Sequence, residues 1–484
     1  MPTFAPPAPF GLRVIDEATG RGIPLVELET VHHLLFVTDS NGWVALSEPD
    51  LLGTDVFFHI RSHGYTFPKD GFGYTGTRIK PMPGGRAVLK MRRINVAERV
   101  CRLTGAGIYA DTVLLGERAP LVSPARNANV LGQDSALAVV YRGRMLWFWG
   151  DTDRAAYPLG NFQTTGATAV FPPGKRTAEA GLEFRYFTGP DGFARAMCPS
   201  QKPGPIWISG VCTTGAGSGE ELWAYYARME SLGVKREHGF VRWDDAQNTF
   251  HFVRELPLTE TWRHLDGHPI RLTENGTEYL AGGFCFPLVR VPADSRRIVE
   301  PGAYQAYTCL LPNGTVKRGD KGEAVYQWQS DVPPMTPERE AELVTQGKLR
   351  LEETRFMPRD VAGKVVTIHA GSVTWNPWRK KWLLFATQKD GSTSALGEIV
   401  YGEADSPIGP WNRVVKIVTH DRYTFYNPVH HPFLDMEGGR VVYFEGTYTA
   451  EFSGNPKLTP RYNYNQILYR LDLADKRLDF ARAA

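Results

Sequence analysis

The segment LGQDSALAVVYRGRMLWFWGDTDR, residues 131–154, decides how this chain folds. It holds two apolar runs separated by Arg142 and Gly143, which predicts a β-hairpin with a two-residue turn. In that register Asp134 and Asp151 face each other at the open end of the hairpin, with Cβ atoms about 4.5–5.5 Å apart. Facing carboxylates destabilise a sheet, so the pair indicates chemistry, through a shared proton or a bound cation. The alternative is scaffolding, in which each aspartate binds nearby main-chain amides.

Similar hairpins recur from about residue 105 onward. We expect inner strand pairs at residues 134–151, 206–228, 268–283, 369–388 and 428–447, each followed by weaker strands. Repeated four-stranded units predict a β-propeller, here with five blades over residues 101–484. One helix is expected at residues 336–347, where a Thr cap is followed by Pro in the first turn and Gly ends the segment.

Residues 1–100 are expected to form a separate small β-sandwich, so the chain is all-β. The stretches GLRVIDEATGRGIPLVELET and LLFVTDSNGWVAL alternate apolar and polar residues around Thr-Gly and Asn-Gly turns, which is typical of short antiparallel strands. The order V.D..TG.GIP, TDSNG and GY within residues 11–93 resembles the carboxypeptidase regulatory-like, transthyretin-type domain. The resemblance implies an accessory module, and nothing in it looks catalytic.

Composition excludes several classes of protein. The 484 residues include 55 basic and 52 acidic ones, a net charge of +3 with no basic run, so we expect neither a nucleic-acid nor a membrane partner. No stretch reaches about 18 apolar residues, so no segment is expected to span a membrane. The start MPTFAPPAPF shows no signal peptide, and the compartment and oligomeric state stay open. The 12 Trp, 20 Tyr and 25 Phe predict a large β core and suit a carbohydrate ligand, whose C–H faces stack on aromatic rings.

The sequence predicts no required cofactor. The five cysteines lie far apart without a CxxC pair, which argues against a cysteine zinc site. Histidines and carboxylates near the channel could hold Zn, Mn or Ca, but no HExxH-like spacing supports a catalytic metal. His430 and His431 are adjacent on a strand and point to opposite faces, so they cannot both be ligands. The possibility of a structural Ca²⁺ or Na⁺ ion in the channel stays open.

Two motifs resemble glycoside hydrolases. YGEADSPIGPW, residues 401–411, resembles the A.S..GPW element of five-bladed propellers such as the arabinanase and xylosidase family 43. The hairpin from GQDSA to WGDT resembles a bacterial five-bladed family that includes endo-D-arabinanases. These resemblances imply glycosidase chemistry and leave the sugar open.

In a propeller, the ends of the inner strands meet at one mouth. The expected turns set three further facing pairs there: His430 with Glu445, His369 with Gln388, and His268 with Gly283. Strands with polar residues at their ends and apolar residues between them are typical of a site built on a rigid scaffold.

Glycoside hydrolysis needs two carboxyl groups, and we assign them by hypothesis. Asp134 is the nucleophile or base, and Asp151 is the general acid. We expect the neighbouring Asp134 and the nearby tryptophans to raise the pKa of Asp151. Glu445 is the reserve acid or a clamp on sugar hydroxyls. The expected substrate-binding residues are Arg126, Asn127, Trp147, Arg154, His268, His369, Gln388, Tyr426 and His430. For the single histidines and the arginines, a structural role is the competing interpretation.

Two other functions stay open. A polysaccharide lyase would use His369 or His430 with Tyr426 for proton abstraction beside a uronate, and Arg126 or Arg154 would neutralise the carboxylate. A non-catalytic carbohydrate-binding propeller would use the same mouth without chemistry.

Overall fold

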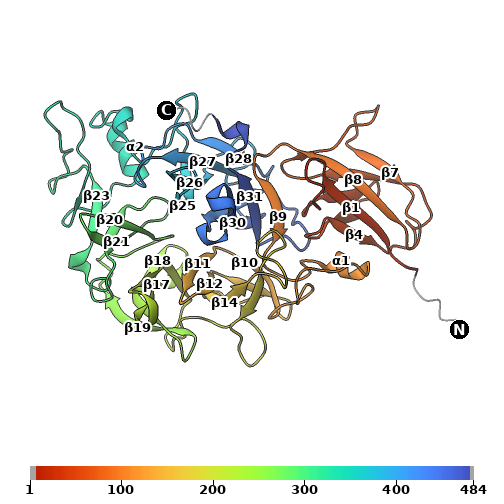
Figure 1. The fold of residues 1–484 in the computed structure, drawn as a ribbon, viewed down its shortest axis with the longest axis horizontal. Coiled ribbons are helices and arrows are strands. Elements are labelled where there is room, and N and C mark those ends of the chain that lie inside the picture. The colour runs from red at the N-terminus through yellow and green to blue at the C-terminus, as the bar shows by residue number, and fades with distance from the viewer. Residues whose placement is uncertain (1–6, 480–484) are drawn as a thin grey trace.

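The computed structural model describes residues 7–479, and strands make up most of its regular structure (Figure 1). The α-helices that lie wholly within residues 7–479 are α1 (Ala110–Leu114) and α2 (Pro337–Thr345). Helix α2 confirms the expected helix, because Thr336 caps it by accepting the main-chain N–H of Arg339 at 3.2 Å. Six short 3-10 turns lie at Gly217–Gly219, Pro301–Ala303, Leu351–Glu353, Pro432–Leu434, Glu437–Gly439 and Lys476–Leu478. Within residues 7–479 no helix has the length and apolar character needed to cross a bilayer.

Two four-stranded sheets form the N-terminal part, with strand orders β4-β1-β8-β6 and β3-β2-β5-β7. Their strands are β1 (Phe10–Asp16), β2 (Glu27–Thr30), β3 (Leu35–Val37), β4 (Trp43–Leu46), β5 (Val56–Arg61), β6 (Tyr65–Thr66), β7 (Gly76–Ile79) and β8 (Arg86–Arg93). Alternate residues of β5 are buried, as the alternating sequence predicts. Leu12 and Val44 of one sheet join Leu28 and Phe58 of the other in one apolar cluster.

Five further sheets follow one another along the chain and lie around a common centre (Figure 1). Sheet I contains β11 (Leu137–Tyr141), β12 (Arg144–Trp149), β14 (Thr165–Val170) and β15 (Glu183–Tyr186). Sheet II contains β16 (Ile206–Thr214), β17 (Glu221–Ser231), β18 (Val234–Asp244) and β19 (Thr249–Leu256). Sheet III contains β20 (Ile270–Glu274), β21 (Thr277–Gly282), β22 (Val289–Pro292), β23 (Gln305–Thr308) and β24 (Gln327–Gln329).

The last two sheets complete this arrangement. Sheet IV contains β25 (Ile368–Asn376), β26 (Lys381–Gln388), β27 (Glu398–Ala404) and β28 (Val415–Val418). Sheet V contains β29 (Thr424–His430), β30 (Val441–Thr449), β31 (Asn465–Asp472) and β9 (Glu98–Arg102). Strand β9 precedes sheet I in the chain yet pairs with β31, so sheet V joins the two ends of this part of the chain. Because β9 begins at Glu98, it crosses the expected boundary at residue 100.

The first strands of all five sheets line one cavity of about 410 Å³. Its walls include Val139 of β11, Val211 of β16, Ile270 of β20, Thr374 of β25 and Val429 of β29. The expected inner strand pairs are therefore confirmed as hairpins, and their first strands lie innermost. This places the ends of five successive hairpins around a shared axis.

The register predicted for the opening hairpin is confirmed. Tyr141 pairs with Arg144 and Leu137 with Phe148. The turn residues Arg142 and Gly143 have φ of 47° and 70°, the left-handed values that a tight two-residue hairpin turn requires. A shorter ladder, β10 (Val130–Gln133) with β13 (Thr152–Arg154), continues beyond the open end of this hairpin.

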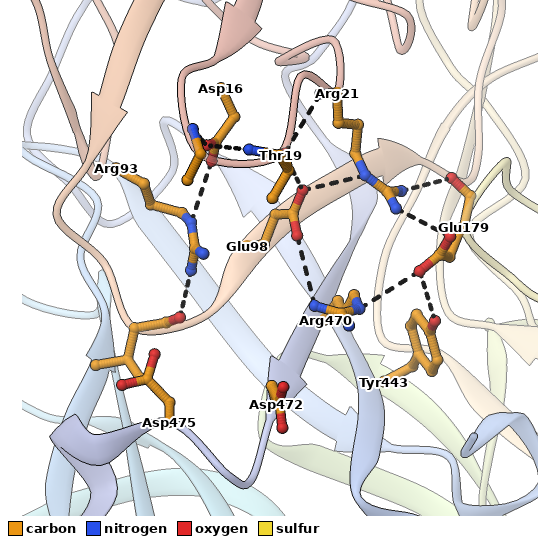
Figure 2. Close-up of polar contacts among 12 residues, drawn as sticks. Asp16, Thr19, Arg21, Arg93, Glu98, Glu179, Tyr443, Arg470, Asp472 and Asp475 are labelled. Atoms are coloured by element: carbon orange, nitrogen blue, oxygen red, sulfur yellow. Dashed lines mark hydrogen bonds and ion pairs between the residues drawn. The ribbon is translucent and has the colours of Figure 1, made fainter. Parts of the chain in front are cut away.

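A charged network joins the N-terminal sheets to sheets I and V (Figure 2). Glu98 on β9 pairs with Arg21 at 3.1 Å and with Arg470 at 3.7 Å. Glu179 pairs with the same arginines at 3.0 and 3.4 Å and accepts a hydrogen bond from Tyr443 at 3.2 Å (Figure 2). Because the side chain of Glu98 is only 3% exposed, removing one partner would leave a buried charge uncompensated. The network therefore fixes the N-terminal part against sheet V.

Candidate active site

Asp134 and Asp151 lie next to each other at the open end of the first hairpin. The main-chain N–H of Gly150 donates to the carbonyl of Asp134 at 2.9 Å, and that of Asp134 donates to the carbonyl of Asp151 at 3.3 Å. The Oδ1 atom of Asp134 accepts a further bond from the main-chain N–H of Asp151 at 2.8 Å. A Cβ on Gly150 would lie 2.3 Å from this Oδ1, so glycine leaves the space that the carboxylate occupies. Both aspartates are half-buried.

The carboxylate of Asp134 is surrounded by donors. Its Oδ2 accepts from the hydroxyl of Tyr426 at 2.7 Å and from that of Ser135 at 3.2 Å, and Tyr464 also hydrogen-bonds to it. Burial raises the pKa of Asp134, and these donors oppose the rise because they favour the charged form. The arrangement suits a group that works as a carboxylate.

Asp151 has fewer hydrogen-bond donors than Asp134 and lies beside its charge. Burial, followed by the charge of Asp134, raises its pKa to about 7. One donor opposes the rise: the indole N–H of Trp207, which lies 2.9 Å from Oδ1 of Asp151. A carboxyl group with a pKa near neutrality can hold and release a proton under working conditions.

Two more acids belong to this cluster, Asp153 on β13 and Glu451 after β30. Burial and then the charge of Asp134 raise the pKa of both carboxyl groups. The charged groups that shift the pKa values of Asp151, Asp153 and Glu451 are all carboxylates. The site therefore has a negative field, which favours neutral over anionic ligands.

Three predicted site residues lie in the core instead. Glu445 is 0% exposed, and its Oε1 accepts from Trp147 Nε1 at 2.8 Å and contacts His431 Nε2 at 2.6 Å. Trp147 is also 0% exposed and cannot stack on a sugar. His430 is buried between Thr374 and Asp435, at 2.5 and 2.9 Å. The roles expected for Glu445 and Trp147 at the mouth were wrong, because these side chains are enclosed between sheets. His430 lines the central cavity of about 410 Å³ but is only 2% exposed.

The three other facing pairs were each wrong by one residue. Glu445 pairs with Val429, Gln388 with Ile368, and Gly283 with Gly267. In sheets IV and V the ladder is interrupted by irregularities at 368–371 and 426–429, where an extra residue shifts the register. In sheet IV the turn half of the ladder follows the prediction, as the pair Trp375 and Trp382 shows. In sheet V the pair His430 and Phe444, on the turn side of the irregularity, is already shifted by one residue.

His268, His369 and Gln388 are half-buried at the inner ends of sheets III and IV. Burial, and then the charge of His431, lower the pKa of His268 to about 4, so its imidazole is neutral near pH 7. The ring of His369 contacts Phe284, in the loop between β21 and β22, with ring centroids 5.8 Å apart.

The remaining predicted residues divide between the acid cluster and its surroundings. Tyr426 belongs to the acid cluster, because its hydroxyl donates a hydrogen bond to Asp134. Asn127 donates to the carbonyl of Phe184 at 2.8 Å, and Arg126 is exposed. Arg154 donates to the carbonyl of Leu159 at 3.2 Å and lies 3.8 Å from Asp191. The guanidinium of Arg154 is therefore engaged by Leu159 and Asp191.

Sequence reasoning missed Trp207, Tyr464 and Glu451 as members of the site. Trp207 lies on β16 of sheet II, and Tyr464 and Glu451 lie in the loop between β30 and β31. No local pattern marks them as neighbours of Asp134 or Asp151. It also missed Asp266, whose Oδ1 accepts from Ser209 and from the main-chain N–H of Gly267 at the inner end of sheet III. An acid directly before an inner strand, in the place that Asp134 has before β11, was the available signal for Asp266. Residues 7–479 contain no group of three or more side chains placed to hold a metal ion.

Comparisons with known proteins give weak structural likenesses. No protein-family model matches the chain, and no curated protein matches it. Among solved structures, one from Bacteroides ovatus, provisionally described as a hydrolase, has a TM-score of 0.44 at 10% identity and covers 74% of this chain and 89% of its own. A GH43_1 enzyme from Xanthomonas citri has a TM-score of 0.34 at 12% identity over 70% and 86%. An exo-β-1,3-galactanase from Phanerochaete chrysosporium has a TM-score of 0.37 at 8% identity over 78% and 65%.

Proposed function

We propose that this protein is a glycoside hydrolase that cuts a neutral poly- or oligosaccharide with Asp134 and Asp151. In this proposal, sheets I–V are the blades of a five-bladed β-propeller, and the N-terminal sheets are a carboxypeptidase regulatory-like β-sandwich that ends before β9. The observation that carries the proposal is the unequal environment of two adjacent carboxyl groups. Asp134 has three side-chain donors, whereas the pKa of Asp151 is raised to about 7.

The two groups would divide the work of cleavage. Asp151 donates its proton to the glycosidic oxygen, which leaves as a hydroxyl group. Asp134, whose donors favour its charged form, attacks the anomeric carbon or removes a proton from the attacking water. Trp207 and Tyr426 hold the two carboxyl groups in place through their hydrogen bonds.

The negative field argues against the lyase alternative. A lyase must neutralise the uronate carboxylate with a cation, and Arg154 faces Leu159 and Asp191 instead. His430, one expected base, is 2% exposed and bound on both ring nitrogens. A carbohydrate-binding protein without catalysis would not need two adjacent carboxyl groups, whose closeness costs stability.

A polysaccharide screen tests the proposal. Purified protein is incubated with arabinan, xylan, galactan and two uronate polymers, pectin and alginate. We expect new reducing ends from a neutral polymer without the ultraviolet absorbance of an unsaturated uronate. Unsaturated products would support the lyase, and binding without any new reducing ends would support a carbohydrate-binding protein.

A further inference from the structure

A cavity of about 600 Å³ lies between the N-terminal sheets and sheet V. One wall includes Leu35, Arg61 and Tyr65, and the other includes Asp421, Arg422 and Lys457. The volume lies within the range of small-ligand sites, which occur preferentially where domains meet.

The cavity lies beside the acid cluster along one loop. Residues 450–464 connect β30 to β31, and they carry Glu451 and Tyr464 at the acid cluster. The same loop supplies residues 455–459 to the cavity wall. Four residues from Glu451 to Asn455 span at most about 14 Å. A polymer held at Asp134 and Asp151 could therefore reach the cavity within a few sugar units.

The walls of the cavity are held in place by buried contacts. Nδ1 of His63 accepts the main-chain N–H of Asp421 at 3.0 Å, so Nε2 carries the proton and donates to the hydroxyl of Tyr448 at 2.9 Å. Arg99, 1% exposed, donates to the carbonyls of Pro24 and His63 at 3.0 Å each. With the network of Figure 2, these contacts make the cavity a preformed space.

The lining suits a polyhydroxylated chain. Asp421, Arg422 and Lys457 are exposed, and no ion pair or side-chain hydrogen bond within residues 7–479 engages their charged groups. Together they offer both donors and acceptors, which a sugar hydroxyl can use in either direction. Leu458 and Ile94, 62% and 53% exposed, add apolar surface for the C–H faces of sugar rings.

We propose that this interdomain cavity binds a distal stretch of the polysaccharide that is cut at Asp134 and Asp151. The proposal rests on the proposed function for the identity of the polymer. It gives the N-terminal part a direct role in holding substrate, since Arg61 and Leu35 belong to that part.

Affinity gel electrophoresis of the full chain tests the cavity without catalysis. The inactive background D134N/D151N is run in gels that contain linear arabinan, xylan or β-1,3-galactan. We expect at least one polymer to retard it. Adding R422A/K457A should raise the dissociation constant by at least about tenfold, because losing even one hydrogen bond to a charged group corresponds to that factor. Retardation by none of the polymers, or equal retardation with and without R422A/K457A, would overturn the proposal.

A kinetic comparison adds a second readout in the active protein. R422A/K457A should lower kcat/KM on the retarding polymer by a larger factor than on its trisaccharide, and an equal loss on both would overturn the proposal. The matched control K175A/R296A removes two exposed cations from loops of sheets I and III and should behave as the parent. If D134N keeps full turnover, the proposed catalytic role fails, while the gel result still reports on the cavity.

Discussion

The main-chain N–H of Asp151 donates to Oδ1 of Asp134 at 2.8 Å, so the backbone of one aspartate stabilises the charge of the other. The same proximity raises the pKa of the Asp151 side chain, because its ionisation would place a second charge beside Asp134. One hairpin end thus gives two identical residues different surroundings, with more donors around Asp134 and a neighbouring charge beside Asp151.

Replacing Asp134 should remove the attacking or base group. We expect Asp134→Asn to lower kcat by about 10²–10⁴-fold, measured by reducing ends, with a melting temperature close to that of the parent because Asn can still accept from Asp151. Asp405→Asn is the control, since Asp405 is 87% exposed in its side chain. Turnover of D134N within twofold of the parent would contradict the assignment.

The raised pKa of Asp151 predicts how activity and stability depend on pH. A general acid must be protonated, so kcat should fall as pH rises through about 7. The folded-state pKa lies above the ordinary value of 3.8, so the favourable contribution of Asp151 is complete below about pH 4 and is lost as pH rises through about 7.

Asp151→Asn removes this titration. Its melting temperature relative to the parent should therefore increase between pH 4 and pH 8, as scanning calorimetry would measure. A constant difference across that range would show that the pKa of Asp151 is not raised.

Removing the indole donor should move the alkaline limb of the pH profile. Trp207→Phe keeps an aromatic ring but deletes the N–H that stabilises ionised Asp151. We expect the apparent pKa of the alkaline limb to rise by about one unit. Trp375→Phe, on a half-exposed tryptophan of sheet IV, should leave the limb in place. A general loss of activity without a shift would indicate that Trp207 only packs.

The sequence predicted those parts of the fold that local chemistry determines. The Arg142-Gly143 and Asn275-Gly276 turns have positive φ at both residues, so they set the register of their hairpins as expected. The irregularities at 368–371 and 426–429 carry no comparable local signal. The irregularity at 368–371 shifts the residues beyond it by one, which is why His369 was placed on the wrong partner. His430 is displaced on the turn side of its ladder, where the connection contains the 3-10 turns Pro432–Leu434 and Glu437–Gly439.

Only the part of the candidate site that lies within one hairpin could be predicted, because local turn chemistry sets pairing within a hairpin but not between sheets. Asp134 and Asp151 belong to one hairpin, so counting from the turn brings them together. Trp207 and Tyr464 are separated from them by long stretches of chain, and only the packing of sheets II and V against sheet I brings them close. Alternation also cannot tell a mouth-facing polar residue from one that points between sheets, which led to the misplacement of Glu445.

The burial of Glu445 predicts a structural role. Its carboxyl group bridges Trp147 of sheet I and His431 after β29, so Glu445→Gln should weaken a buried hydrogen-bonded bridge and leave the acid cluster unchanged. We expect the free energy of unfolding to fall by about 1–3 kcal/mol, measured by urea titration, while kcat stays at the parent value. Glu352→Gln, at an exposed position, should change neither quantity. A hundredfold fall in kcat at unchanged stability would instead place Glu445 among the catalytic residues.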